Sequence, residues 1–287
     1  MQKFAVIDIG SNSVRLMYVV DGKVLYKRVS TTRLGEGIAD KPALKTTAIE
    51  RTATAVAEFF HLAKAEGAEE VFAFATAAVR TAENRRVFLE KVRELCGLEI
   101  EVVSGETEAE IGILGALGNG DGGVIDAGGA STELVVKKDG VLTYKKSVDI
   151  GVVRIKDLCG RNGSKLEKAA ETAATEYGAP ALGETLYAIG GTATTLAALQ
   201  LGLTEYDPEK ITGMEITVEQ MRTQAETLLK KSVEEIAAMP CMPKGRADVL
   251  AGGAVLLAVL MEKFNVKKLV VSDRDNLEGY AIKKGLL

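Results

Sequence analysis

Two segments of the chain repeat one pattern, and this repeat constrains the fold more than any other feature of the sequence. Val6–Leu16 reads VIDIGSNSVRL and Val124–Leu134 reads VIDAGGASTEL, so the two copies lie 118 positions apart. Each copy predicts a buried strand, an Asp-x-Gly turn rich in small and hydroxyl residues, and a second strand. One duplication of this size indicates two similar α/β halves that face one another across a cleft, rather than a solenoid of short repeats.

Strands and helices alternate along both halves, which is typical of an α/β fold. The first half begins with three strands, and Asp21-Gly22 between two alternating apolar runs predicts a hairpin there. Apolar periodicity predicts helices over residues 47–65, 83–95, 104–117, 152–159, 165–177, 218–230, 233–238 and 244–264, and one more from Thr192. The glycine-rich stretch Gly118–Gly123 is the expected boundary between domains 1–117 and 118–274, with the terminal helix 275–287 packing back on the first domain.

The composition excludes several kinds of chemistry. His61 is the single histidine, and its place in the predicted helix EFFHLAKAEG favours a structural role over a Ser-His-Asp mechanism. Cys96, Cys159 and Cys241 lie far apart, without zinc-ligand spacing, and unpaired cysteines fit a reducing compartment. The chain shows neither a signal-peptide pattern nor an apolar run of about 18 residues, so we expect a cytoplasmic protein that does not enter a membrane.

The charge balance is mildly acidic. The formal net charge is −4, from 36 Lys and Arg against 40 Asp and Glu, which disfavours nucleic-acid binding because that needs a basic face. A polyanionic substrate remains compatible, since a few arginines and aligned backbone amides make a cleft locally positive. Several arginines near strand ends, glycines or small residues would suit phosphate oxygens if they shared a cleft: Arg15, Arg33, Arg80, Arg154 and Arg246.

Both Asp-x-Gly turns have the residue types that bind phosphate. Without bulky side chains, backbone N–H groups approach an anion closely, and hydroxyl side chains add donors. Asp8 and Asp126 would not touch phosphate directly but would hold a hydrated Mg²⁺ that bridges to it. One copy alone would be interpreted as an ordinary glycine turn, and the matched second copy favours phosphate. The turns contain Gly10, Ser11, Asn12 and Ser13, and Gly128, Gly129, Ser131 and Thr132.

A third glycine site and an acidic helix start each allow two interpretations. In AIGGTATTLAAL, a predicted strand leads into Gly190-Gly191, and a predicted helix begins near Thr192. The two glycines would suit either an anion bound at the helix N-terminus or a close crossing of helix and strand. The sequence contains no GxxxxGK[ST] P-loop. In SGETEAE, Ser104 is a good N-cap and the helix dipole favours the acids, but a carboxylate here would also face the cleft as general base for an attacking water.

Together these segments resemble the exopolyphosphatase / guanosine pentaphosphate phosphohydrolase (Ppx/GppA) family, over nearly the whole chain and in the same order. AVIDIGSNSVRL is similar to the family's first phosphate loop and VIDAGGASTELV to its second. FATAAVRTAEN, VVSGETEAEIG and AIGGTATTLAAL are similar to its Thr-Ser-Ala-x-Arg-x-Ala-x-Asn, Ser-Gly-x-Glu-Glu-Ala and Gly-Thr-Ala-Thr segments. The two loops alone would also suit sugar kinases, actin-like and Hsp70-like proteins, and the segment around Glu108 separates this family from those.

The resemblance implies an acetate-kinase/actin-like fold, with two ribonuclease-H-like domains around a cleft, and Mg²⁺-dependent hydrolysis of a terminal phosphoanhydride. It implies Glu108 as the catalytic glutamate, and Asp126 as a catalytic aspartate that holds the metal together with Asp8. The phosphate-binding residues that it implies are Gly10, Ser11, Asn12, Ser13, Arg15, Arg80, Gly128, Gly129, Ser131, Thr132, Gly191, Thr192 and Arg246.

The chain departs from the family pattern at three places. Ala130 stands where the second loop usually has a third glycine, and Glu110 stands where many members have arginine. SDRDNLEG, residues 272–279, replaces the usual Ser-Asp-x-Gly-Leu-Arg-Glu-Gly, so an arginine is absent there too. The chain also stops after the second domain, without the helical HD-type extension of the longer members, which leaves long-chain processivity open.

We therefore expect an exopolyphosphatase-type hydrolase that releases terminal phosphate from inorganic polyphosphate, with Glu108 activating the attacking water. Guanosine pentaphosphate (pppGpp) is the alternative substrate. A non-hydrolytic sensor that binds (p)ppGpp or a nucleotide is a further alternative, in which the lost arginines abolish turnover, and a kinase on the same fold is a third. For assembly, the family-based expectation is a homodimer.

Overall fold

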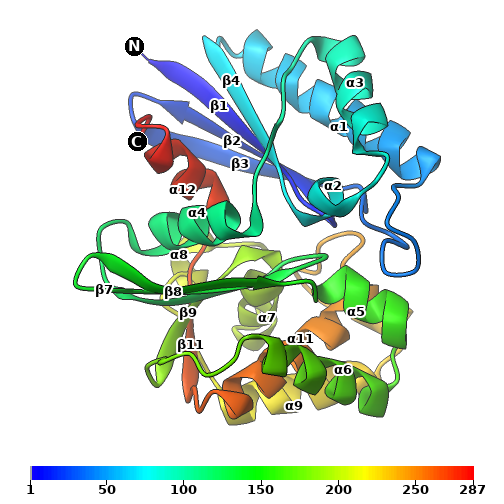
Figure 1. The fold of residues 1–287 in the computed structure, drawn as a ribbon, viewed down its shortest axis with the longest axis vertical. Helices are drawn as coiled ribbons and strands as arrows, with labels where there is room; N and C mark the ends of the chain where they lie inside the picture. Colours follow the sequence, from blue (N-terminus) through cyan, green and yellow to red (C-terminus); the bar gives the residue numbers. More distant parts are fainter. Residues whose placement is uncertain (1) are drawn as a thin grey trace.

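The computed structural model describes residues 2–287, and residues 3–102 build the first of its two sheets (Figure 1). The strands β1 (Lys3–Ile9), β2 (Ser13–Val20), β3 (Lys23–Thr31), β4 (Glu70–Ala75) and β5 (Glu101–Val102) lie in the order β3-β2-β1-β4-β5. β1 is antiparallel to β2 and parallel to β4. The β2–β3 hairpin turns at Asp21 and Gly22, whose φ angles of 48° and 73° are those expected of an Asp-Gly turn.

The second sheet repeats the topology of the first. Its strands β6 (Gly122–Ala127), β7 (Thr132–Lys138), β8 (Val141–Val148), β9 (Thr185–Ile189), β10 (Glu215–Thr217) and β11 (Lys268–Val271) lie in the order β10-β11-β9-β6-β7-β8. From β8 to β11 the order matches that of the first sheet, with β6 antiparallel to β7 and parallel to β9. β10 adds an antiparallel strand at the edge. Both sheets thus have the ribonuclease-H-like strand order, and the expected duplication is confirmed.

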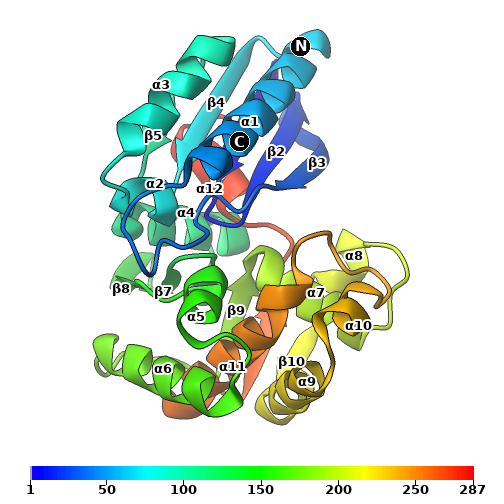
Figure 2. The same ribbon diagram turned by 90° about the vertical axis from the view of Figure 1, so that its right-hand side faces the viewer.

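Helices cover the outer face of each sheet (Figures 1 and 2). α1 (Thr46–Ala65) packs on β1, β2 and β4 and on α3 (Arg85–Cys96), with α2 (Ala77–Thr81) beside them. Over the second sheet, α11 (Ala247–Lys263) is the central buried helix, and it contacts α5 (Val152–Cys159), α6 (Gly163–Glu176) and α9 (Val218–Lys230). The remaining helices of this half are α7 (Gly190–Gln200), α8 (Pro208–Ile211) and α10 (Val233–Ala237).

Several helices differ from the sequence-based expectation. α2 and α8 were not predicted, because their five and four residues are too few to show a helical period. α7 begins at Gly190 rather than at Thr192, so both glycines of the AIGGT segment lie in its first turn. The backbone N–H groups of this turn therefore belong to a helix N-terminus, where the dipole favours an anion.

Two further helices, α4 (Gly105–Leu117) and α12 (Asn276–Lys283), lie between the sheets and pack on each other (Figure 1). α4 follows the last strand of the first sheet, yet it covers β6, β7 and β8 of the second, with Ala109 and Ile113 in a shared apolar cluster. α12 follows the last strand of the second sheet and packs on β1, with Leu277 and Tyr280 in the cluster of the first sheet. The inner face of the second sheet is thus covered by α4, which follows the first sheet in the chain. The inner face of the first sheet is covered by α12, which follows the second.

Glycines allow these two helices to cross at close range. A Cβ atom on Gly279 would lie 1.6 Å from the carbonyl oxygen of Ile111, and one on Gly115 would lie 1.8 Å from that of Asp275. Backbone therefore meets backbone on both sides of the crossing. The position of α4 fixes Glu108, and the position of α12 fixes Asp275 and Asn276, so this crossing sets the geometry of the cleft described below.

The single histidine and the three cysteines lie in different segments of the chain. His61 is exposed on α1, where its ring packs against Phe60 with centroids 5.5 Å apart. Cys96, Cys159 and Cys241 are free and partly buried. Within residues 2–287, the helices are too short or too polar to cross a membrane.

Replacing Gly279 by alanine is expected to lower the free energy of unfolding by about 2–4 kcal/mol, because the added methyl group forces α4 and α12 apart. Urea unfolding measures the change. Gly183→Ala is the control, since the nearest atom to its added Cβ lies 3.8 Å away. Equal stabilities of the two variants would show that the helix crossing tolerates a side chain.

Candidate active site

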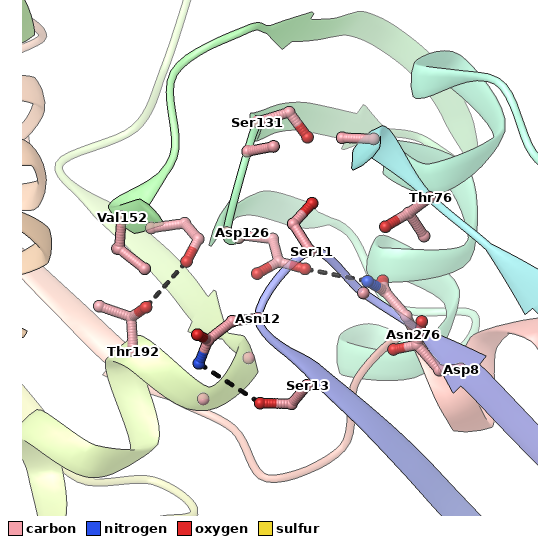
Figure 3. Close-up of a pocket in the computed structure, with 18 of the residues that line it drawn as sticks. Asp8, Ser11, Asn12, Ser13, Thr76, Asp126, Ser131, Val152, Thr192 and Asn276 are labelled. Atoms are coloured by element: carbon pink, nitrogen blue, oxygen red, sulfur yellow. Dashed lines mark hydrogen bonds between the residues drawn. The ribbon is translucent and has the colours of Figure 1, made fainter. Parts of the chain in front are cut away.

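A cavity of about 80 Å³ lies where the ends of β1, β6 and β9 meet the first turns of α4 and α7 (Figure 3). All residues that the sequence predicted for the site line this cavity, except Arg80 and Thr132. The lining residues among them are Asp8, Gly10, Ser11, Asn12, Ser13, Arg15, Glu108, Asp126, Gly128, Gly129, Ser131, Gly191, Thr192 and Arg246. The two Asp-x-Gly turns and the third glycine site therefore converge on one small space.

The two glycine loops, which both line the cavity, also contact each other. A Cβ on Gly129 would lie 2.7 Å from the Cβ of Ser11, so the second loop lies directly against the first. The N-terminus of α5 holds the second loop, because the N–H groups of Val152 and Val153 donate to the carbonyls of Gly128 and Gly129 at 2.9 and 2.8 Å. These backbone bonds fix the loop without using its side chains.

Two of the predicted threonines have structural hydrogen bonds. The hydroxyl of Thr132 is fully buried and donates to the carbonyl of Ile150 at 2.5 Å, outside the cavity. The hydroxyl of Thr192 donates to the carbonyl of Ala127 at 2.9 Å and ties the start of α7 to the end of β6 (Figure 3). Thr192 still lines the cavity, where its oxygen keeps acceptor capacity.

Glu108 faces the cavity from the first turn of α4. Ser104 caps that helix, with its Oγ accepting from the N–H of Thr107 at 3.0 Å, as expected. Glu108 is 5% exposed, whereas the side chain of Glu106 is 72% exposed and pairs with Lys145. Burial raises the pKa of Glu108, and the neighbouring Arg80 opposes this rise. A buried carboxylate with a raised pKa has the properties of a general base or acid.

Arg80 acts on the site through Glu108. Its guanidinium donates to Glu108 Oε2 at 2.8 Å and to the carbonyl of Val103 at 3.1 Å. Arg80 does not line the cavity and orients the Glu108 carboxylate from outside it. Glu110, the acid at the position where the family pattern often has arginine, lies away from the cavity and pairs with Lys145 and Lys283.

Asp8 and Asp126 line the cavity from the ends of β1 and β6. Oδ2 of Asp8 accepts from Arg15 Nε at 2.9 Å, while its buried Oδ1 has no hydrogen-bond partner among the described residues. Oδ2 of Asp126 accepts from Asn276 Nδ2 at 2.9 Å (Figure 3). Burial raises the pKa of Asp126 to about 7, with Arg15 opposing the rise and Glu108 adding to it.

Arg246 is the arginine of this cleft that lacks a carboxylate partner within residues 2–287. It is 8% exposed, and its guanidinium lies over Gly191, where a Cβ atom would come within 2.4 Å of it. Burial lowers its pKa to about 10, which still leaves it charged at neutral pH. By contrast, Arg33 pairs with Asp248, and Arg154 donates to the carbonyl of Ala130. Arg246 is therefore the cation available to an anion in the cavity.

The sequence-based reasoning missed several residues at this site. Thr76, at the start of α2, and Asn276 line the cavity. Glu133 is 2% exposed and lies opposite Asp126 in the β6–β7 ladder, where burial raises its pKa well above the usual value. A glutamate inside the otherwise apolar strand TELVV was an available signal for Glu133. Asn276 and its neighbour Asp275 carried no such signal, because their partners lie far away in the sequence.

Comparison with known proteins agrees with this geometry. The sequence pattern of the Ppx/GppA phosphatase family matches residues 16–286. An exopolyphosphatase 2 of Mycobacterium tuberculosis is 32% identical, with 98% of each chain covered. A guanosine-5'-triphosphate,3'-diphosphate pyrophosphatase of Vibrio atlanticus is 28% identical over 99% of this chain and 58% of its own. The crystal structure of the Aquifex aeolicus Ppx/GppA family member superposes with a TM-score of 0.79 at 30% identity, covering 99% of this chain and 98% of that one.

The resemblance that the motifs indicated is thereby confirmed, and the two similar sheets agree with the duplicated two-domain fold that it implied. The family match includes the whole second sheet, the second glycine loop and the segment that carries Glu108, and it begins after the first loop at residues 10–13. The chain belongs to the Ppx/GppA phosphatase family.

Proposed function

We propose that this protein hydrolyses the terminal phosphoanhydride of inorganic polyphosphate and releases phosphate. The observation that carries the proposal is the meeting of one buried glutamate, two amide-lined glycine loops and the free Arg246 in a cavity of about 80 Å³. Phosphoryl transfer depends mainly on positioning and on stabilising charge, which this arrangement provides. The exopolyphosphatase relative, which matches over the full length, supports the same substrate class.

Each part of the cavity has a role in this reaction. The terminal phosphoryl group lies between the two loops, where backbone N–H groups and Arg246 bind its oxygens. Glu108 orients a water molecule and accepts its proton as the water attacks phosphorus. Arg80 keeps the Glu108 carboxylate aimed at that water. The bond between the terminal phosphorus and the bridging oxygen breaks, the shortened polyphosphate leaves with that oxygen, and the attacked phosphoryl group is released as phosphate.

A divalent cation, expected to be Mg²⁺, fits the carboxylates of this cleft. The buried Oδ1 of Asp8 has no partner among the described residues, and the ionised form of Asp126 is destabilised by its surroundings, so a cation would satisfy both. Within residues 2–287, no three Asp, Glu, His or Cys side chains come together as a ready chelating group. Asp8 and Asp126 would therefore hold the ion together with water or phosphate oxygens. The ion would neutralise the charge of the phosphoryl group.

A second cavity favours pppGpp as the alternative substrate. It has a volume of about 440 Å³ and shares Arg15, Gly190, Gly191 and Arg246 with the first. Apolar and aromatic side chains, including Val29, Tyr206 and Met242, line its other walls. A space of this kind beside a phosphate site suits a nucleoside better than a bare phosphate chain. The Vibrio relative carries the corresponding name.

Phosphate release from tripolyphosphate, longer polyphosphate and pppGpp, each with Mg²⁺, decides between these substrates. We expect the highest kcat/KM with polyphosphate. A higher value with pppGpp would overturn that order in favour of the nucleotide. Binding of pppGpp without release would identify a sensor, and release that requires an acceptor other than water would identify a kinase.

Glu108→Gln is expected to lower kcat by about 100-fold or more, because the amide cannot accept the proton of the attacking water. The amide oxygen still accepts from Arg80, so folding and tripolyphosphate binding should persist. Glu106→Gln is the matched control, since that exposed acid is in the same helical turn but faces solvent. Turnover by Glu108→Gln at the control's rate would remove Glu108 from its assigned role.

Asp126→Asn tests the charge of the cleft through stability. The pKa of Asp126 rises from 3.8 to about 7 on folding, so its ionisation destabilises the folded protein increasingly as pH rises between these values. Asparagine carries no charge to bury. In urea unfolding with EDTA, the stability of the variant relative to wild type should therefore rise by about 2–3 kcal/mol from pH 5 to pH 8.

The same pair of proteins tests the cation. Mg²⁺ added at pH 8 should stabilise the wild type against urea and should stabilise Asp126→Asn far less, because a ligand that binds the folded state raises its stability. Equal stabilisation of both proteins would place the ion away from Asp126.

A further inference from the structure

Asp275 brings a carboxylate into the cleft from the segment that links β11 to α12. It is 6% exposed, and its Oδ1 accepts from the N–H of Leu277 at 3.0 Å, which caps α12. Its Oδ2 accepts from a terminal nitrogen of Arg15. One carboxylate thus performs two separate tasks, helix capping and pairing with an arginine that lines the phosphate cavity.

Arg15 is enclosed by anions of the protein itself. Its Nε and one terminal nitrogen contact Oδ2 of Asp8, and its other terminal nitrogen contacts Asp275. Lys27, the other cation near Asp275, has its own partners in Asp273 and Glu278. The direct partner that the Asp275 carboxylate neutralises is therefore Arg15.

Arg15 is nevertheless placed to meet a substrate. It lines both the cavity of about 80 Å³ and its larger neighbour, so a phosphate chain that passes from one to the other meets this guanidinium. The Asp275 carboxylate competes with such a phosphate for the N–H groups of Arg15. Because Asp275 is part of the chain, it does not lose the translational and rotational entropy that a dissolved anion loses on binding. Helix capping does not require this charge, because asparagine caps a helix as well as aspartate does.

We propose that Asp275 sets the affinity of the cleft for phosphate chains: its carboxylate pairs with Arg15 and competes with substrate phosphate oxygens for that guanidinium. The inference rests on the proposed function, since it takes a polyphosphate as the ligand. Arg246, which has no such internal anion, supplies the principal cationic contact, and Asp275 keeps the contribution of Arg15 small. The affinity of the site is thereby held below the value that it would have if this terminal nitrogen of Arg15 were free.

Asp275→Asn removes the charge and keeps the cap. Tripolyphosphate binding is measured by calorimetry with Mg²⁺, with Glu108→Gln present in every protein so that no turnover intervenes. The dissociation constant should fall about fivefold in Asp275→Asn, which corresponds to one charge removed from the vicinity of a phosphate in a partly screened cleft. The logarithm of the binding constant should also fall more steeply with the logarithm of salt concentration, because the terminal nitrogen of Arg15 that Asp275 held is then free to pair with phosphate, while Asp8 keeps its own contacts.

Glu110→Gln is the matched control. It removes one negative charge from the outer side of the α4–α12 pair, where Lys145 and Lys283 hold it away from the cavity. Its dissociation constant should stay within about twofold of the parent, because two lysines already neutralise this partly exposed carboxylate and solvent ions screen it. A fall equal to that of Asp275→Asn would attribute the effect to net charge and not to Arg15.

The remaining outcomes are separable. Unchanged or weaker binding by Asp275→Asn, with an unfolding free energy like that of the parent, overturns the role of Asp275 and leaves the proposed function intact. If Asp275→Asn unfolds more easily, Asp275→Ser, which also provides a capping oxygen, repeats the comparison. The absence of tripolyphosphate binding by the parent protein overturns both proposals.

Discussion

The crossing of α4 and α12 between the two sheets is the constraint on which the rest of the structure depends. Backbone meets backbone there, since Gly115 and Gly279 leave no room for a Cβ atom. The crossing delivers Glu108 to the cleft from one helix and Asp275 and Asn276 from the other. The apolar clusters on its two sides join each helix to a different sheet, so the positions of the polar groups follow from hydrophobic packing.

Most of the charge in the cleft is arranged as ion pairs, and Arg246 and Asp126 are exceptions among the described residues. Arg15 is neutralised by Asp8 and Asp275, and Arg80 by Glu108, while Arg246 is buried with no carboxylate beside it in the part of the chain that the structure describes. Burying a lone guanidinium is costly, as its lowered pKa shows. An anionic ligand would remove that cost. The same burial acts in the opposite sense on Asp126, which would be stabilised by a cation.

Local sequence patterns predicted much of this architecture, and long-range contacts account for what they missed. The repeat of Asp8 at Asp126 predicted both loops and their convergence, because a duplicated strand–turn–strand unit places its turn at the same edge of each sheet. The cap at Ser104 predicted where α4 begins. The pairing of Arg15 with Asp275 spans 260 positions, and that of Asp126 with Asn276 spans 150, so no local pattern reports them. Arg80 was expected to meet phosphate, but its relation to Glu108 also depends on tertiary packing.

The exchange of α4 and α12 has a consequence for how the two halves depend on each other. Each half is completed by a helix that follows the other half's last strand, which is the connectivity of two subunits that have swapped their terminal helices. Without α12, the first half would expose the apolar inner face of its sheet, including Phe4, Val6 and Met17. Each half therefore relies on the other to bury the inner face of its sheet.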